Sequence, residues 1–174
     1  KLTRMGLPTE VDDVLNSSLI VARYLRKTMR RGQRVYVIGE EPIRRELLDH
    51  GIDCTDRDEE ADIVVLSWGR EFTYAKLNAL YQAALRGAAV IASNPDATCP
   101  LENGQLPDTG TMIAALETAL GRPAVTVVGK PSRIAAETAA ERLGLAYGDC
   151  FVIGDRLETD IRMANDCGMH SVLV

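Results

Sequence analysis

The chain alternates short apolar runs with stretches of helical periodicity, and this alternation narrows the possible folds more than any other feature. The apolar runs are Val35 to Ile38, Ile63 to Leu66, Val90 to Ala92, Val125 to Val128, Phe151 to Ile153 and Val172 to Val174. Runs this short and this apolar are typical of strands that are buried on both faces of a sheet. The stretches between them carry apolar residues every three or four positions, which predicts helices. The sequence therefore predicts an α/β fold with a mainly parallel sheet.

Two regions between the strands are predicted in more detail. The longest helical stretch runs from Glu10 to Arg30, with Thr9 as its N-cap. The polar stretch from Ser93 to Gly104 is rich in Asn, Asp and Pro, and we expect it to be a long irregular loop. Long loops in compact domains often carry function, although a plain surface connection is an equally good interpretation.

Composition excludes some classes of protein. A length of 174 residues with 46% hydrophobic residues suffices for one domain or for two small interleaved ones. The net charge of −5 has the wrong sign for a protein that mainly coats nucleic acid. We find no apolar run long enough for a membrane span and no secretory leader, so we expect a cytoplasmic protein. The four cysteines are widely spaced and are predicted to be reduced thiols rather than zinc ligands.

Ligands of parallel sheets collect beyond the carboxyl ends of the strands, so polar residues that follow the apolar runs are candidate site residues. The first such segment is Gly129-Lys130-Pro131-Ser132. Gly129 allows close approach, Ser132 can cap the next helix, and Lys130 places a cation suited to a phosphate or carboxylate. Taken alone, an ordinary surface lysine is the simpler interpretation of Lys130.

The second segment runs from Gly154 to Asp160 and holds two aspartates. Asp155 leaves the end of a strand and Asp160 follows after a turn, so the two carboxylates can converge on one point. Hard oxygen ligands in this arrangement favour Mg²⁺. The alternative is structural, with Asp155 or Thr159 capping a helix and Asp160 lying near the helix N-terminus. The segment alone leaves both interpretations open.

Together the two segments resemble the third and fourth motifs of the haloacid dehalogenase (HAD) superfamily of phosphatases. The similarity is closest to its NagD and para-nitrophenyl-phosphatase-like branch, which includes phosphoglycolate, glycerol-phosphate and pyridoxal-phosphate phosphatases. Further segments resemble this branch in the same order: Val37 to Glu40, Ala61 to Val65, Ala92 to Asp96 and Pro107 to Gly110. The resemblance implies a partial Rossmann-like core, residues 1–26 and 125–174, with an inserted α/β cap domain, residues 27–124.

The resemblance also implies roles for individual residues. Lys130 would be the catalytic lysine that holds the substrate phosphoryl group. Asp155 would bind Mg²⁺ with Asp160 in support, and Asn94 and Asp96 in the cap loop would help to select the substrate. The implied reaction is Mg²⁺-dependent hydrolysis of a small phosphate monoester, such as a sugar or glycerol phosphate, through an aspartyl-phosphate intermediate. The implied partner is a small phosphorylated metabolite, without nucleic acid or membrane, and the resemblance allows a homodimer through the cap.

The chain departs from this family in one respect that matters for catalysis. The family's nucleophile is the first aspartate of an Asp-x-Asp-Gly motif, and no such motif occurs in these 174 residues. We therefore expect a fragment that lacks segments at both ends and is inactive by itself. The alternative is a non-enzymatic module: a degenerate HAD relative, or an unrelated α/β domain kept for ligand binding or assembly.

Overall fold

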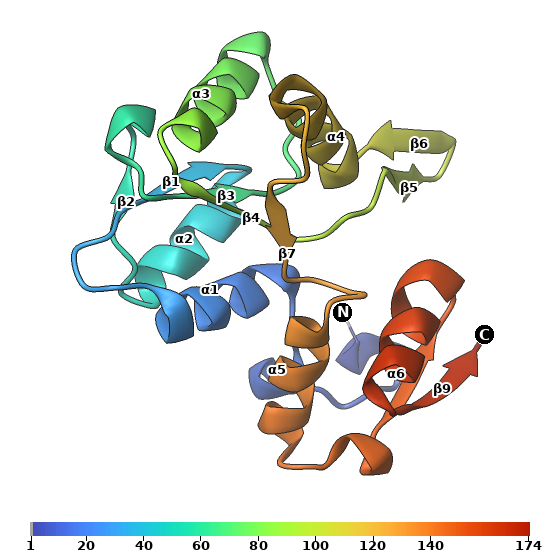
Figure 1. Cartoon of the computed structure of the whole chain (residues 1–174). Helices are drawn as coiled ribbons and strands as arrows, with labels where there is room; N and C mark the ends of the chain where they lie inside the picture. The colour runs from blue at the N-terminus through green and yellow to red at the C-terminus, as the bar shows by residue number, and fades with distance from the viewer. Residues whose placement is uncertain (1) are drawn as a thin grey trace.

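The computed structural model describes residues 2–174, and it has the predicted α/β architecture (Figure 1). Five strands form one parallel sheet in the order β2-β1-β3-β4-β7. These strands are β1 (Val35–Ile38), β2 (Cys54–Thr55), β3 (Ile63–Leu66), β4 (Ala89–Ala92) and β7 (Val125–Val127). The remaining strands form an antiparallel hairpin, β5 (Thr98–Leu101) with β6 (Gly104–Pro107), and a separate parallel pair, β8 (Phe151–Gly154) with β9 (His170–Leu173).

The helices divide the molecule into two units (Figure 1). On one face of the five-stranded sheet lie α1 (Ser17–Thr28) and α2 (Glu41–Asp49), and on the other lie α3 (Tyr74–Leu85) and α4 (Thr109–Leu120). We call residues 17–127 the five-stranded unit. The helices α5 (Arg133–Leu143) and α6 (Arg162–Cys167) pack together and accompany β8 and β9. Residues 128–174 are the two-stranded unit.

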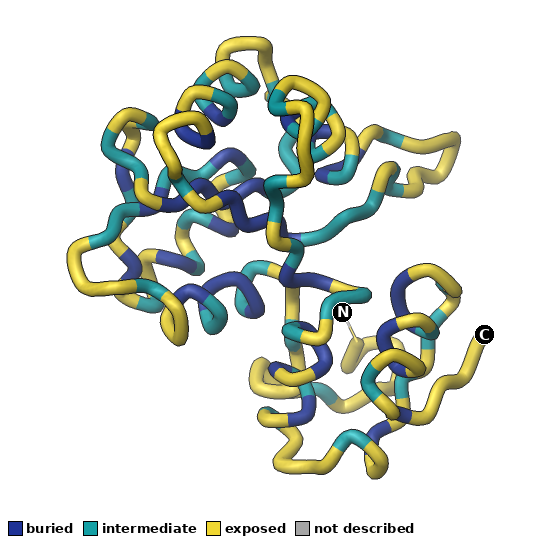
Figure 2. The backbone as a smooth tube through the Cα atoms, in the orientation of Figure 1, coloured by how far each residue is buried: buried dark blue, intermediate teal, exposed yellow. Residues whose placement is uncertain are grey.

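The central strands are buried because their side chains alternate between two apolar layers. Val35, Val65 and Ile91 belong to the layer under α1 and α2, whereas Val64 and Leu66 belong to the layer under α3 and α4. Burying a side chain of this size stabilises a fold by roughly 1.5–3 kcal/mol. The first layer continues into α5 and α6, so the two units share one core, and Figure 2 shows the buried positions on the elements that face it.

The long first helix is shorter than predicted. It begins at Ser17, because the side chain of Asn16 accepts a hydrogen bond from the Leu19 amide at 2.8 Å and acts as the N-cap. The Thr9 hydroxyl instead donates to the Leu7 carbonyl at 2.8 Å. A 3-10 turn covers Val11–Asp13, and Val11 is 87% exposed, so the predicted start of the helix at Glu10 with Thr9 as its N-cap is wrong.

The predicted loop from Ser93 to Gly104 is also shorter than expected. Its second half forms the hairpin of β5 and β6, in which Thr98 pairs with Pro107. Leu101 pairs with Gly104, so Glu102 and Asn103 form the tight turn, and Gly104 directly after it adopts a positive φ of 143° that favours glycine. Only the segment from Ser93 to Ala97 remains irregular, and it lies at the carboxyl end of β4.

Two elements bear on how the chain is divided. The predicted boundary at residue 125 places the strand β7 in the core segment. In the structure, β7 pairs with β4 at the edge of the five-stranded sheet. The helix α1 continues past the predicted boundary at residue 26, to Thr28. The first proposed boundary therefore falls within α1, whereas the second coincides with the start of β7. Among residues 2–174, no helix combines the length and the hydropathy needed to cross a bilayer.

Candidate active site

The carboxyl ends of the strands from both units open into one cavity of 760 Å³. All five residues predicted for the site line it. Lys130, Asp155 and Asp160 come from the two-stranded unit, and Asn94 and Asp96 come from the loop after β4. The structure therefore brings together residues that are up to 66 positions apart in the chain, from Asn94 to Asp160.

Lys130 and Asp160 form the charged centre of this cavity. The Lys130 Nζ atom lies 2.5 Å from Asp160 Oδ1, and the Thr159 hydroxyl lies 3.3 Å from Asp160 Oδ2. The Asp160 side chain is 8% exposed, whereas that of Lys130 is 51% exposed. Because a buried carboxylate needs compensation, Lys130 neutralises Asp160. The half-exposed ammonium keeps donors free for a second anion in the cavity.

The backbone around Lys130 is fixed on both sides. Before it, β7 ends at Val127, and after it the Ser132 side chain caps α5 by accepting a hydrogen bond from the Ile134 amide at 3.2 Å. The predicted capping role of Ser132 is confirmed. The Lys130–Pro131 peptide bond is cis. Lys130 thus lies on a short connection between a strand and a capped helix.

Two glycines bring the loops of the site into close contact. A Cβ atom on Gly129 would lie 2.1 Å from the Ser93 carbonyl oxygen, and one on Gly154 would lie 2.5 Å from Asp160 Cγ. Neither distance is compatible with a side chain, so both positions require glycine because of packing rather than φ. Gly129 holds the Lys130 loop against the loop after β4, and Gly154 holds Asp160 against the end of β8.

Replacing Gly129 with alanine is expected to destabilise the protein by about 3 kcal/mol, at the upper end of the range for overpacked sites, because the clash is with backbone. Urea unfolding monitored by circular dichroism measures the change. The matched control is Gly148→Ala, since a Cβ there meets no atom within 4 Å. The control is expected to change the free energy of unfolding by less than about 0.5 kcal/mol. Equal effects of the two substitutions would contradict the role assigned to Gly129.

Asp155 and Asp160 lie at the two ends of a distorted turn. Residues Leu157–Ile161 form a π-helical turn that leads into α6, and such turns occur frequently at functional sites. The structural alternative holds in part. In the described part of the chain no side chain caps this turn or α6, but Asp160 does lie in the first turn of this helical segment. Asp155 is exposed and forms no hydrogen bond or ion pair with another described residue.

This pair of carboxylates fits magnesium better than a metal that needs a full protein cage. Within residues 2–174 there is no group of three or more His, Cys, Asp or Glu side chains that could hold a metal ion. Structural zinc sites need four such ligands, and calcium takes six to eight oxygens. Mg²⁺ is commonly held by one or two carboxylates and completes its shell with water and phosphate oxygens. Asp155 and Asp160 both line the cavity and are two carboxylates of this kind.

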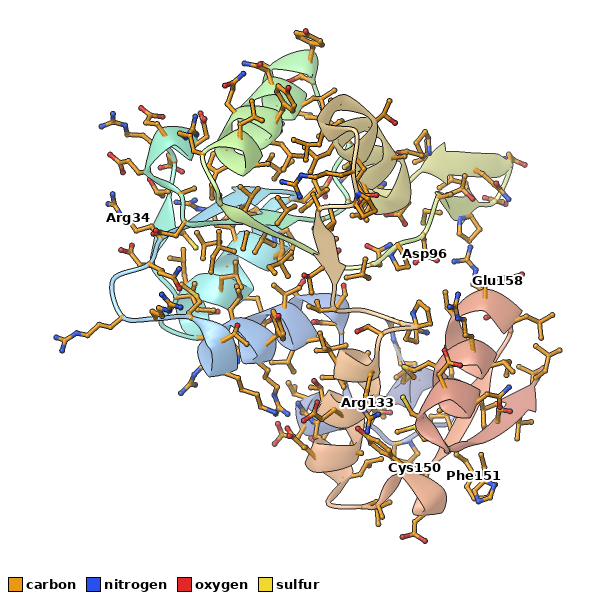
Figure 3. The ribbon with its side chains drawn as sticks, in the orientation of Figure 1. Arg34, Asp96, Arg133, Cys150, Phe151 and Glu158 are labelled. Atoms are coloured by element: carbon orange, nitrogen blue, oxygen red, sulfur yellow. The ribbon has the colours of Figure 1, made fainter. Side chains whose placement is uncertain are left out.

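The structure gives Asp96 a partner that the sequence did not indicate. Both its carboxylate oxygens are engaged: Oδ1 accepts from Arg156 Nη1, and Oδ2 accepts from Asn94 Nδ2 at 3.0 Å. Figure 3 shows Asp96 on the side of the five-stranded unit that faces the two-stranded unit. The only sequence signal for Arg156 is its position directly after Asp155, in a loop that follows a strand.

Glu40 and Trp68 also line the cavity, although the sequence interpretation did not predict them as site residues. They follow β1 and β3. Glu40 accepts two hydrogen bonds of 2.7 Å from Arg70, whose guanidinium lies 5.5 Å from the centroid of the Trp68 ring. These hydrogen bonds lower the pKa of Glu40 below its ordinary value, so its carboxylate stays ionised at the edge of the cavity.

Comparison with known proteins shows the family of the chain. Residues 127–174 match the HAD-hydrolase-like family, and residues 1–53 match the haloacid dehalogenase-like hydrolase family. A thermostable NPPase from Geobacillus stearothermophilus superposes with a TM-score of 0.91 and is 30% identical, over 99% of this chain and 68% of that one. This chain belongs to the haloacid dehalogenase-like hydrolase family.

Two further relatives bear on the activity. The sugar-phosphatase AraL of Bacillus subtilis is 40% identical over the whole of this chain, which spans 64% of its length. A glycerol phosphate phosphatase from Mycobacterium tuberculosis, solved in complex with magnesium, is 34% identical with a TM-score of 0.88, over 99% of this chain and 52% of that one. The chain thus spans less than two thirds of the length of either protein.

Proposed function

We propose that the protein containing this chain is a Mg²⁺-dependent phosphatase of small phosphate monoesters, such as sugar or glycerol phosphates. The observation that carries the proposal is the cavity that holds a half-exposed Lys130, a buried Asp160 and an exposed Asp155 together. A cation beside two carboxylates suits a phosphoryl group accompanied by a divalent metal. The names of the sugar and glycerol phosphate phosphatases among the relatives support the same substrate class.

In this proposal the residues of the chain bind and orient the phosphoryl group. Lys130 donates to a phosphoryl oxygen and stabilises the negative charge that develops there, while its contact with Asp160 fixes the position of the ammonium. Asp155, supported by Asp160, would hold Mg²⁺. The bound metal supplies positive charge for the phosphoryl oxygens. The aspartyl-phosphate route of the family needs an Asp-x-Asp-Gly nucleophile, and these 174 residues contain none. The nucleophile is therefore part of the proposal and not of the observed site.

Hydrolysis of para-nitrophenyl phosphate tests the proposed function. The longest protein that contains this chain is expected to release para-nitrophenol with Mg²⁺ and to lose this activity in EDTA. The 174 residues alone are expected to be inactive. If the longest protein is folded but hydrolyses neither para-nitrophenyl phosphate nor sugar and glycerol phosphates, the non-catalytic relative is the correct interpretation. Activity from the 174 residues alone would show that the nucleophile lies within them.

We also propose a location and an oligomeric state for the protein. A cytoplasmic location suits a small phosphorylated metabolite as substrate, and the four cysteines are free thiols in the structure. A homodimer through the cap, residues 27–124, is proposed from the family resemblance, and light scattering on the purified protein measures it.

A further inference from the structure

One ion pair joins the two units at the wall of the cavity. Asp96 lies in the loop after β4, Arg156 lies in the loop after β8, and the Arg156 Nη1 atom donates to Asp96 Oδ1. The other guanidinium nitrogen, Nη2, lies 3.5 Å from the Thr98 carbonyl oxygen. The Asp96 side chain is 23% exposed, so the pair is partly shielded from water. Arg156 therefore binds two successive parts of the opposite unit.

A series of hydrogen bonds within the five-stranded unit orients the Asp96 carboxylate. The Ser93 hydroxyl oxygen lies 2.8 Å from Asn94 Oδ1 and 2.9 Å from the Ser67 hydroxyl oxygen. The hydroxyl of Ser93 has one proton and the amide oxygen of Asn94 can only accept, so Ser67 must donate to Ser93. The donors then run in one direction, from Ser67 through Ser93 and Asn94 to Asp96. Ser93 is 1% exposed, which protects these hydrogen bonds from competition by water.

The backbone of the same loop is held by the start of α4. The Asp96 carbonyl accepts from the Gly110 amide at 2.8 Å, and the Ala97 carbonyl accepts from the Asp108 amide at 2.9 Å. A Cβ atom on Gly110 would lie 2.3 Å from the Pro95 carbonyl oxygen, so the loop and the helix are in direct contact. Asp96 is thus a fixed point on the five-stranded unit.

Arg156 connects this fixed point to the candidate metal ligands. Its carbonyl accepts hydrogen bonds from the amides of Asp160 and Ile161, at 3.1 and 3.2 Å, and these bonds form the π-helical turn. Asp155 precedes Arg156 directly in the chain. A displacement of Arg156 would therefore move Asp155 and Asp160 together, relative to the five-stranded unit.

We propose that Asp96 and Arg156 are positioning residues that form a clamp between the two units and set the position of the Asp155–Asp160 turn over the cavity. Asp96 then acts through Arg156 and does not contact the substrate, in contrast to the substrate-binding role that the family resemblance implies for it. The kinetic test of this clamp rests on the proposed function, whereas the hydrogen-exchange test does not.

Amide hydrogen exchange tests the clamp independently of catalysis. In the longest protein that contains this chain, Asp96→Asn and Arg156→Gln are each expected to raise exchange about fivefold in both segments, 93–98 and 155–161. The double variant is expected to exchange no faster than either single variant. The control Glu141→Gln breaks the Lys27–Glu141 pair of 2.7 Å, which joins α1 to α5 away from the cavity, and should leave both segments unchanged. Exchange that rises only in the segment carrying each substitution would overturn the clamp.

Kinetics distinguish positioning from substrate contact. We expect each single variant to lower kcat by about tenfold, by the same factor for para-nitrophenyl phosphate and for a sugar phosphate, with the double variant equal to either. If instead Asp96→Asn changes KM by different factors for the two substrates, and its effect multiplies with the effect of Arg156→Gln, then Asp96 contacts the substrate directly. That result would overturn the proposal. If even the unsubstituted protein hydrolyses no phosphate ester, the proposed function fails, and the exchange result still decides whether the clamp exists.

Discussion

Replacing Lys130 with alanine is expected to lower kcat for phosphate-ester hydrolysis by about 10²-fold or more, comparable to the loss of one oxyanion donor in other enzymes. The physical reason is that the half-exposed ammonium of Lys130 lies in the cavity that Asp155 and Asp160 also line. Alanine removes the donor to the phosphoryl oxygen and the charge that stabilises the transition state. Steady-state kinetics with para-nitrophenyl phosphate, in the longest protein that contains this chain, measure the effect.

A second variant separates catalysis from folding. Lys130→Ala leaves the Asp160 carboxylate buried without its partner, which destabilises the fold. Adding Asp160→Asn removes that charge, so the double variant is expected to regain stability in urea unfolding without regaining turnover. Lys27→Ala is the matched control, since Lys27 pairs with Glu141 outside the cavity. Turnover at the level of the unsubstituted protein in Lys130→Ala would exclude the role assigned to this lysine.

The sequence predicts those parts of the fold that depend on local pattern. The bounds of β1 and β3 are predicted correctly, because both strands are continuous apolar runs. The predicted helices between the apolar runs are also present, among them α4 (Thr109–Leu120). Lys130, Asp155 and Asp160 were selected because each follows a predicted strand, and all three line one cavity. The strands β7 and β8 belong to different sheets, however, so the rule about sheet edges does not explain how these residues meet.

The errors arise where several local signals compete. Both Thr9 and Asn16 are plausible N-caps, and the sequence alone does not show that residues 11–13 would form a separate 3-10 turn. The sequence interpretation also gave the polar composition after β4 more weight than the Asn103-Gly104 turn signal. A capping preference or a polar composition predicts a local state only when no better alternative lies nearby.

The clamp could not be predicted from local pattern at all. Asp96 and Arg156 are 60 residues apart, and each has an ordinary surface interpretation in its own segment. Their pairing depends on how the loop after β4 approaches the loop after β8. The close packing at Gly129 and Gly110 fixes the first of these two loops. Sequence reasoning therefore finds the charged groups of the site but not which of them neutralise one another.

The second large effect is expected for Asp155→Asn. Asp155 is exposed and unpaired among residues 2–174, so asparagine should leave the free energy of unfolding nearly unchanged. It removes the charge that would hold Mg²⁺, however. We expect the affinity for Mg²⁺, measured by calorimetry on the substrate-free protein, to fall by more than about tenfold, because the loss of an outer-shell partner alone costs about 10- to 100-fold at metal sites. The Mg²⁺ concentration for half-maximal activity should rise in parallel.

Glu158→Gln is the matched control for Asp155→Asn. Glu158 lies three positions later on the same turn, is exposed, and does not line the 760 Å³ cavity. A change of net charge near the turn affects both variants equally, whereas the loss of a metal ligand affects only Asp155→Asn. If both variants weaken Mg²⁺ binding by the same factor, the effect is long-range electrostatics and Asp155 is not a ligand. If neither variant changes the Mg²⁺ dependence, the metal is bound by groups outside this turn, and the interpretation of Asp155 and Asp160 as a carboxylate pair for magnesium is wrong.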